Sequence, residues 1–312
     1  MNKTKILAVV GPTASGKSAL ALAMAERLSG EIISCDSMQI YRRMDIGTAK
    51  PTEAERAAVR HQMIDIVEPT QAFTCADYVA EAMRAIEDCA SRGKLPIVCG
   101  GTGLYLDALL RGSDFAEGGA DENLRCELAE WASREGNEAL HAELRRIDPE
   151  SADAIHPNNV KRVIRAIEIF RTTGLTKTEL DRKSREGGER YDATVIGLRY
   201  LDRERLYARM DRRVDMMLDE GLLEETRRLL DEGVFMANQT AAQAIGYKEL
   251  LGYLRGEEDL EKAVETLKMA TRRYGKRQMT WFAAKPYVRW LDADEKTFEE
   301  IVNIAENLFS PS

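Results

Sequence analysis

The chain has 312 residues, of which 44% are hydrophobic and 31% are charged, and its formal net charge is −8. This composition excludes a disordered chain and a collagen-like fibre, and the length allows two domains or one domain with an insertion. Because no apolar run reaches the roughly 20 residues needed to cross a bilayer, we expect no membrane partner.

The cysteines and the first residues both bear on the cellular compartment. The sequence holds five cysteines without C-x-x-C spacing: Cys35, Cys75, Cys89, Cys99 and Cys126. An odd number of scattered cysteines is typical of free thiols in a reducing compartment and predicts no zinc site. Residues 1–5 lead directly into an apolar run rather than a signal peptide. We therefore expect a cytoplasmic protein.

A phosphate-binding motif follows the first expected strand, residues 5–10, and precedes a helical pattern over 18–24. It fits G-x-x-x-x-G-K-[ST], in which backbone N–H groups and a helix N-terminus surround phosphate oxygens. Lys17 adds a point charge, and the Ser18 hydroxyl is placed to ligate Mg²⁺. The alternative is a glycine-rich turn without a ligand. The predicted phosphate-binding residues are Gly11, Pro12, Thr13, Ala14, Ser15, Gly16, Lys17 and Ser18.

A carboxylate, Asp36, follows the second expected strand at residues 31–35. In a parallel sheet this strand ends at the edge from which the phosphate-binding loop also emerges. A carboxylate at that place can hold Mg²⁺ or accept a proton. The alternative is an aspartate that caps the next turn.

The remaining elements predict an α/β fold. Apolar runs at 62–67 and 95–99 are separated by a helical pattern over 76–92. Strands that alternate with helices indicate a parallel sheet flanked by helices, the P-loop NTPase-like architecture.

The pattern then changes, and this change predicts the domain organisation. Strand character is weak from about 112 to 188 and returns at 193–200 and 287–291. We therefore expect a P-loop α/β core formed by residues 1–112 and 191–312. A helical insertion domain, residues 113–190, is expected to be hinged at the pairs Gly118–Gly119 and Gly187–Gly188.

Charge is unevenly distributed along the sequence. Residues 114–155 hold twelve acidic and four basic side chains, whereas residues 268–290 hold seven basic and none acidic. At 100° per residue the second segment forms a helix with an apolar face and a basic face. The cations on that face are Lys268, Arg272, Arg273, Lys276 and Arg277. Five cations without an anion favour contact with phosphates over an ordinary solvated face.

A second basic helix face is expected in the insertion. Pro157 and one of the asparagines at 158 and 159 mark a helix start. Apolar residues then fall on one side, and Lys161, Arg162 and Arg165 fall on the other.

Four segments together carry a resemblance that spans nearly the whole chain: Gly11–Ser18, Asp36–Pro51, Gly100–Tyr105 and Ala270–Trp281. In this order they resemble the bacterial tRNA dimethylallyltransferases, also called tRNA isopentenyltransferases. The resemblance implies transfer of a dimethylallyl group from dimethylallyl diphosphate to N6 of the adenosine next to the anticodon of a tRNA. Mg²⁺ is the implied cofactor, and the anticodon stem-loop is the implied partner of the insertion domain.

The same resemblance implies roles for individual residues. Asp36 is the implied general base, Lys17 and the loop hold the leaving diphosphate, and Thr102 meets the target nucleotide. Arg213 is the expected additional diphosphate contact, with Arg209 as the second choice. The implied tRNA-binding residues are Asp36, Ser37, Met38, Gln39, Thr102, Asn159, Lys161, Arg162 and Arg165. Position 161 departs from the shorter polar residue or glutamine frequent in the family.

Two other functions are also compatible with these residues. A P-loop kinase for a small molecule explains the loop and Asp36, but leaves the basic helices unexplained. A non-catalytic RNA-binding module switched by a nucleoside triphosphate explains the basic helices without chemistry at Asp36. For the transferase we expect a monomer.

Overall fold

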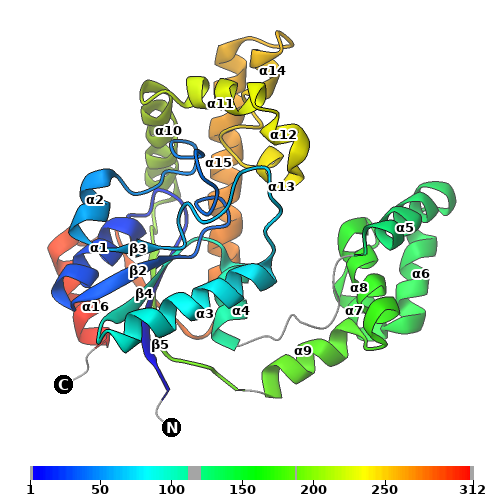
Figure 1. The fold of residues 1–312 in the computed structure, drawn as a ribbon, viewed down its shortest axis with the longest axis horizontal. Helices are drawn as coiled ribbons and strands as arrows, with labels where there is room; N and C mark the ends of the chain where they lie inside the picture. Colours follow the sequence, from blue (N-terminus) through cyan, green and yellow to red (C-terminus); the bar gives the residue numbers. More distant parts are fainter. Residues whose placement is uncertain (1–2, 112–120, 187, 310–312) are drawn as a thin grey trace. The chain divides into compact units, whose positions relative to one another are not determined.

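The structure is a computed structural model that describes residues 3–111, 121–186 and 188–309. The chain divides into two compact units (Figure 1). Residues 1–110 and 191–312 form the first, the core unit, and residues 111–190 form the second, the insertion unit. The expected hinge at Gly118–Gly119 lies outside the described residues, as does Gly187.

A six-stranded parallel sheet forms the centre of the core unit, with the strand order β3-β2-β4-β1-β5-β6. This sheet, flanked by helices, confirms the predicted fold class. The insertion enters between β4 and β5, so β1 pairs with a strand from each side of it. The strands are β1 (Lys5–Val10), β2 (Gly30–Ser34), β3 (His61–Gln62), β4 (Leu95–Gly100), β5 (Asp192–Arg199) and β6 (Val288–Asp292).

Helices cover both faces of the sheet and extend beyond its carboxyl edge (Figure 1). Those before the insertion are α1 (Lys17–Arg27), α2 (Glu53–Ala58), α3 (Cys75–Ser91) and α4 (Gly103–Arg111). Those after it are α10 (Arg203–Asp219), α11 (Leu222–Asp231), α12 (Val234–Ala237), α13 (Gln239–Ala242), α14 (Leu251–Leu254), α15 (Leu260–Ala283) and α16 (Phe298–Phe309).

The two faces of the sheet follow from the alternation of side chains along each strand. On β1, Ile6 and Ala8 point into a cluster formed with α3 and α4, whereas Leu7 and Val9 point into a cluster formed with α1 and α16. All four side chains are fully buried. The first strand is therefore apolar on both faces, as expected for the centre of a parallel sheet.

A third apolar cluster lies beyond the carboxyl edge of the sheet. It packs the segment after Asp36, through Ile40, Tyr41 and Met44, against α11 and the helices that follow it. The long helix α15 begins in this cluster at Leu260 and continues to the sheet, where its Phe282 joins the core (Figure 1). One helix therefore connects the third cluster to the strand ends.

The expected strand at 62–67 is wrong beyond its first residue. Only His61 and Gln62 pair with β2, and a single isolated bridge joins Val67 to Tyr41. Met63 has φ +63° and Asp65 has φ +58°. This left-handed backbone is incompatible with an extended strand, so the apolar run folds as a bent loop.

The insertion unit is helical in its described residues. Its helices are α5 (Glu122–Glu135), α6 (Asn137–Ile147), α7 (Pro149–Ala154), α8 (Val160–Thr173) and α9 (Lys177–Glu186). Leu128, Leu140, Leu144, Val163 and Ile167 are fully buried and form its own core. The unit therefore has the internal packing of an independent domain.

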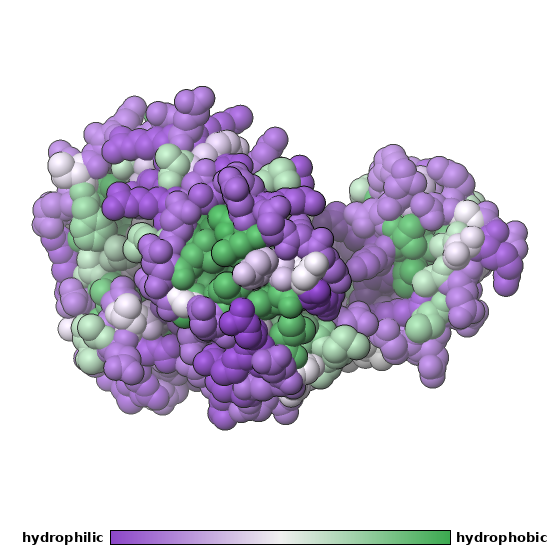
Figure 2. Space-filling model, turned by 90° about the horizontal axis from the view of Figure 1, so that it is seen from above, coloured by the Kyte–Doolittle hydropathy of each residue, from purple (hydrophilic) through white to green (hydrophobic). Residues whose placement is uncertain are grey.

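The surface is mainly polar. Figure 2 shows hydrophilic side chains over most of the face seen from above, with apolar areas between them on the core unit. Met236 on α12 is the most exposed large apolar side chain of the described residues, at 84%. Within those residues no helix is long and apolar enough to cross a membrane.

Candidate active site

The phosphate-binding loop connects β1 to α1, as predicted. Gly11 has φ +150°, and a Cβ at this position would lie 2.7 Å from the backbone oxygen of Leu198, so only glycine fits. Gly16, with φ +96°, is the N-cap of α1, and no described side chain caps that helix. The first N–H groups of α1 are therefore available to an anion.

A buried hydroxyl inside this loop points to the same conclusion. The Ser15 side chain is 2% exposed, and its Oγ has no hydrogen-bond partner among the described residues. A buried polar atom without a partner costs free energy, on the order of 1–3 kcal/mol. A phosphate oxygen would satisfy it, so the loop fits the ligand class predicted from the motif.

Two cations and a carboxylate share the space beside the loop. Burial lowers the pKa of the Lys17 ammonium, and the nearby Arg213 lowers it further, whereas Cys99 and Asp36 raise it. Burial also lowers the pKa of Arg213, against the opposing effect of Asp36. Lys17 Nζ donates to the backbone oxygen of Pro12 at 3.3 Å. The positive charge is therefore incompletely compensated, and a bound anion would stabilise it.

The two arginines proposed for diphosphate binding differ in their contacts. Arg209 donates from Nε to the backbone oxygen of Ala14 at 2.9 Å, and its guanidinium lies 5.4 Å from the ring centre of Tyr200. Arg213, one helical turn further along α10, interacts with Lys17 and Asp36 instead. This difference favours Arg209 as a support of the loop and Arg213 as the diphosphate contact.

Asp36 lies two residues beyond the end of β2. Its Oδ1 accepts hydrogen bonds from the backbone N–H of Met38, at 2.8 Å, and of Gln39, at 3.4 Å. The aspartate therefore caps the next turn, which was the alternative interpretation, and it also lies close enough to Lys17 and Arg213 to affect their pKa values. The turn therefore holds the Asp36 carboxylate near these cations.

Thr102 is joined to the same turn from the end of β4. Its Oγ1 accepts a hydrogen bond from the backbone N–H of Ser37 at 3.1 Å, and its own N–H donates to the Cys35 oxygen at 3.2 Å. Burial raises the pKa of Tyr274, and a hydrogen bond with the Thr102 side chain opposes this increase. The structure thus brings together the predicted residues from β1, β2 and β4.

A residue that the sequence analysis missed lies between two of these loops. Gln278 of α15 is 5% exposed. Its Oε1 accepts from the backbone N–H of Thr13 at 2.8 Å, and its Nε2 donates to the backbone oxygen of Gly101 at 3.1 Å. The signal in the sequence was a glutamine on the apolar face of a helix, within the segment Ala270–Trp281 that carried part of the resemblance.

The side chain of Gln39 is engaged within the protein. Its Oε1 accepts from Ser34 Oγ at 2.8 Å, and its Nε2 donates to the backbone oxygens of Thr48 and Ala49 at 3.2 and 3.0 Å. Met38 packs partly buried against the third apolar cluster. In this arrangement the amide of Gln39 shapes the loop, and its contact with tRNA stays a prediction.

A buried carboxylate on α11 holds the continuation of this loop. Glu225 is 5% exposed and accepts hydrogen bonds of 3.0–3.1 Å from the backbone N–H groups of Asp45, Ile46 and Gly47. The Tyr247 hydroxyl donates to the same carboxylate at 2.7 Å. Four donors around one buried carboxylate fix the loop that follows Asp36.

The basic face expected on α15 carries less free charge than its sequence indicates. Lys268 pairs with Asp215 at 2.7 Å and Arg272 pairs with Asp211 at 2.6 Å, both acids belonging to α10. Lys285 pairs with Asp107 at 2.5 Å. Acidic side chains of other elements thus neutralise part of the positive charge of residues 268–290. The cations that remain exposed on the face are Arg273, Lys276 and Arg277.

The predicted tRNA-binding residues of the insertion unit lie on α8 and at its N-cap, Asn159. Lys161 and Arg162 are exposed. Arg165 instead donates to the fully buried Glu168 at 2.8 Å, and Arg125 donates to the same carboxylate at 2.9 Å. Arg165 therefore has a structural role that its position on the basic side did not predict.

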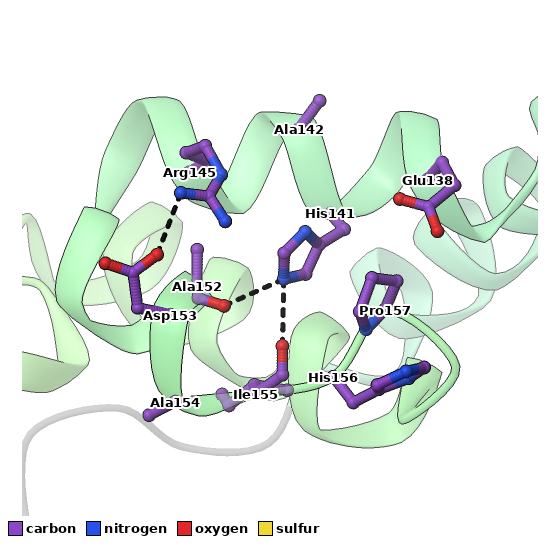
Figure 3. A pocket seen from close by; sticks show the side chains of 10 residues that line it. All are labelled: Glu138, His141, Ala142, Arg145, Ala152, Asp153, Ala154, Ile155, His156 and Pro157. Atoms are coloured by element: carbon purple, nitrogen blue, oxygen red, sulfur yellow. Dashed lines mark hydrogen bonds and ion pairs between the residues drawn. The ribbon is translucent and has the colours of Figure 1, made fainter.

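A pocket of about 570 Å³ lies in the insertion unit, between α6 and the segment that includes α7 (Figure 3). His141 Nε2 lies at 3.0 and 2.8 Å from the backbone oxygens of Ala152 and Ile155, so its ring closes one wall. Arg145 pairs with Asp153 at the rim. The pocket contains none of the predicted site residues.

The parallel sheet, the loop 11–18 between β1 and α1 and the adjacent carboxylate define a P-loop-like α/β protein. The sequence model of the family described as IPP transferase matches residues 39–285, and the chain belongs to this family.

Individual relatives agree with this assignment. The chain is 48% identical to a tRNA dimethylallyltransferase of Acetivibrio thermocellus, covering 97% of this chain and 96% of the relative. A tRNA isopentenylpyrophosphate transferase from Bacillus halodurans has a similar crystal structure, with a TM-score of 0.73, 44% identity and coverage of 98% and 97%. A eukaryotic dimethylallyltransferase acting on tRNA is 30% identical, with a TM-score of 0.82 and coverage of 99% and 80%.

Proposed function

We propose that the chain is a tRNA dimethylallyltransferase, which transfers the dimethylallyl group of dimethylallyl diphosphate to N6 of the adenosine next to the anticodon. The observation that carries this proposal is the position of Asp36 beside Lys17 and Arg213 at the phosphate-binding loop. A carboxylate that accepts a proton and cations that bind diphosphate are the two groups that this transfer needs at one place.

On the donor side, the loop binds and neutralises the leaving group. The N–H groups at the start of α1 and the Ser15 hydroxyl donate to the diphosphate oxygens, and Lys17 and Arg213 supply positive charge. Negative charge grows on the diphosphate as the bond to the dimethylallyl carbon breaks. Donors that are already oriented stabilise this charge without reorganisation, which makes them effective in the transition state.

On the acceptor side, the adenine amine attacks the carbon that the diphosphate leaves. The bond from carbon to the diphosphate oxygen breaks, the bond from N6 to carbon forms, and one N6 proton passes to the Asp36 carboxylate. The turn through Met38 and Gln39 binds Oδ1, so Oδ2 is the oxygen that we assign to the proton. Thr102, fixed by Ser37, borders the place of the nucleotide.

The donor set at the loop fits Mg²⁺. The Ser18 hydroxyl and the diphosphate are hard oxygen donors, and Mg²⁺ is usually bound through one or two protein oxygens together with substrate phosphates. Within the described residues no cluster of three or more His, Cys, Asp or Glu offers a dedicated metal cage, which agrees with this mode of binding. When bound there, Mg²⁺ would help to neutralise the departing diphosphate.

The insertion unit is proposed to hold the anticodon stem-loop. Lys161 and Arg162 are exposed on α8 and can reach phosphates. The target base must leave its stack to reach Asp36, at a cost of a few kcal/mol, and the bases of an anticodon loop are suited to this because they are single-stranded. A cytoplasmic location and a monomeric state stay predictions from the sequence.

One assay tests the function. The protein is incubated with Mg²⁺, tRNA and either dimethylallyl diphosphate labelled in the alkyl group or ATP labelled in the γ-phosphate. We expect label from the first compound in tRNA, at the adenosine next to the anticodon, and no transfer of the γ-phosphate. Transfer of the γ-phosphate without transfer of the dimethylallyl group would identify a kinase. RNA binding without transfer of either group would identify a binding module.

A further inference from the structure

The P-loop donates one of its backbone hydrogen bonds to another part of the same chain. The Thr13 N–H donates to Oε1 of Gln278 at 2.8 Å, across 265 positions of the sequence. In a phosphate-binding loop such N–H groups normally face the phosphate oxygens. Gln278 therefore occupies a donor that a longer phosphate chain would use.

The orientation of the Gln278 amide is fixed at both ends. Its Nε2 donates to the Gly101 oxygen at 3.1 Å while Oε1 accepts from Thr13. The reverse orientation would set an NH₂ group against the Thr13 N–H and a carbonyl against the Gly101 carbonyl. Consequently Gln278 presents its acceptor oxygen, rather than its NH₂ group, to the loop at Thr13.

The side chain also has little room to withdraw. A Cβ on Gly101 would lie 2.0 Å from Gln278 Nε2, so the turn that follows β4 packs directly against the amide. One helical turn earlier, a Cβ on Gly275 would lie 2.2 Å from Met210 Cε and 3.8 Å from Pro12 Cβ. Helix α15 is thus closely packed beside the loop at two successive turns.

We propose that Gln278 limits this P-loop to two phosphates and thereby discriminates against nucleoside triphosphates. The start of α1, Ser15 and Lys17 remain for a diphosphate. A third phosphate near Thr13 would meet the Gln278 oxygen, an acceptor facing an acceptor, and would have to break the bond to Thr13. The inference rests on the proposed function in one respect, that the bound group is a diphosphate.

The experiment compares two inorganic ligands, diphosphate and tripolyphosphate, by isothermal titration calorimetry at fixed free Mg²⁺ and ionic strength. For the wild type we expect diphosphate to bind about 10-fold or more tightly than tripolyphosphate, the size of effect that one unsatisfied polar contact gives. Gln278→Ala should reduce this ratio by about 10-fold, because it frees the Thr13 N–H.

A second variant separates specificity from a general loss of structure. Gln278→Glu keeps an acceptor next to Thr13 and adds negative charge, so it should maintain or increase the ratio in favour of diphosphate. Both variants lose the donor to Gly101, so a purely structural role would move the two ratios in the same direction. Gln239→Ala, at an exposed glutamine on α13, is the matched control and should leave the ratio unchanged.

Equal ratios in the wild type and Gln278→Ala, or a shift in the same direction for both Gln278 variants, would overturn the inference. The prenyl-transfer assay on the wild type distinguishes this outcome from failure of the proposed function. If the wild type transfers the dimethylallyl group but the affinity ratio is the same in wild type and variants, only the role of Gln278 is excluded. If the wild type neither transfers the group nor binds diphosphate, the proposed function is excluded.

Discussion

The core unit and the insertion unit both present cations, but they hold them in opposite ways. At the P-loop, Lys17 and Arg213 are partly buried and both lie near the Asp36 carboxylate. On α8, Lys161 and Arg162 are exposed to solvent. Desolvated charges bind one ligand in one geometry, whereas exposed charges attract a polyanion over a distance and are screened by salt. The comparison predicts a specific chemical site in one unit and an electrostatic surface in the other.

The largest effect is expected at Asp36. Asp36→Asn keeps an oxygen for the N–H groups of Met38 and Gln39 but removes the basicity, so kcat should fall by about 100-fold or more. Single-turnover transfer of labelled dimethylallyl groups to tRNA measures this change. Donor affinity should stay within a few-fold of the wild type. A nearly unchanged rate would show that Asp36 only caps the turn.

Lys17 is expected to give the next largest effect, on diphosphate binding. Lys17→Ala should weaken inorganic diphosphate binding by roughly 10- to 100-fold, because a charge-assisted hydrogen bond of about 1.5–3 kcal/mol is lost. Calorimetric titration gives the dissociation constant. An effect below two-fold would mean that the helix N-terminus alone binds the anion.

The buried position of Lys17 also predicts a dependence on pH. Burial lowers its pKa below the ordinary value of 10.5, and bound diphosphate favours the charged form. Binding therefore takes up protons, and diphosphate affinity should decrease as the pH rises through this lowered pKa. Lys17→Arg, which does not titrate in this range, should show a flatter profile. Identical profiles for the two proteins would assign the titration to another group.

The exposed cations on α8 should have a smaller effect, on tRNA binding, and this effect should depend on the salt concentration. Lys161→Ala together with Arg162→Ala should weaken tRNA binding by roughly 10-fold at moderate salt and reduce the slope of log K against log salt by about 0.7–0.9 for each lost phosphate contact. Filter binding over a range of salt concentrations measures both quantities. Arg134→Ala, at an exposed arginine on α5, is the control. An unchanged slope would place the tRNA elsewhere.

Arg165 should differ from these two neighbours because it binds a buried carboxylate. Arg165→Ala should lower the stability of the protein by about 1–2 kcal/mol, since Glu168 loses one of its two arginine partners and keeps Arg125. Urea denaturation gives this value. Arg162→Ala should change stability by less than about 0.5 kcal/mol. Equal stability of the two variants would contradict the structural role of Arg165.

The parts of the site that could be predicted from the sequence are those encoded locally. The loop 11–18 is a continuous motif between a strand and a helix, and Asp36 follows a buried strand directly. The apolar run at 62–67 failed because its pattern does not reveal the left-handed backbone of Met63 and Asp65. Periodicity reports burial, and both a strand and a bent loop can be buried.

The remaining parts depend on contacts between distant segments. Gln278 could not be assigned because its partners, Thr13 and Gly101, are 265 and 177 positions away. The free charge on α15 was overestimated for the same reason, since Asp211 and Asp215 come from α10. A local count of charges cannot include counterions that only the fold brings near.

The pairing of β1 with both β4 and β5 has a consequence for synthesis on the ribosome. When the first 110 residues have emerged, β1 has gained β4 but its other edge has no partner until β5 is made. The contiguous segment 111–190 is completed in between and can pack its own core first. Only after residue 278 does the P-loop obtain its last hydrogen bond. The nascent chain can therefore complete the insertion unit before the P-loop site, whose contacts join segments distant in sequence.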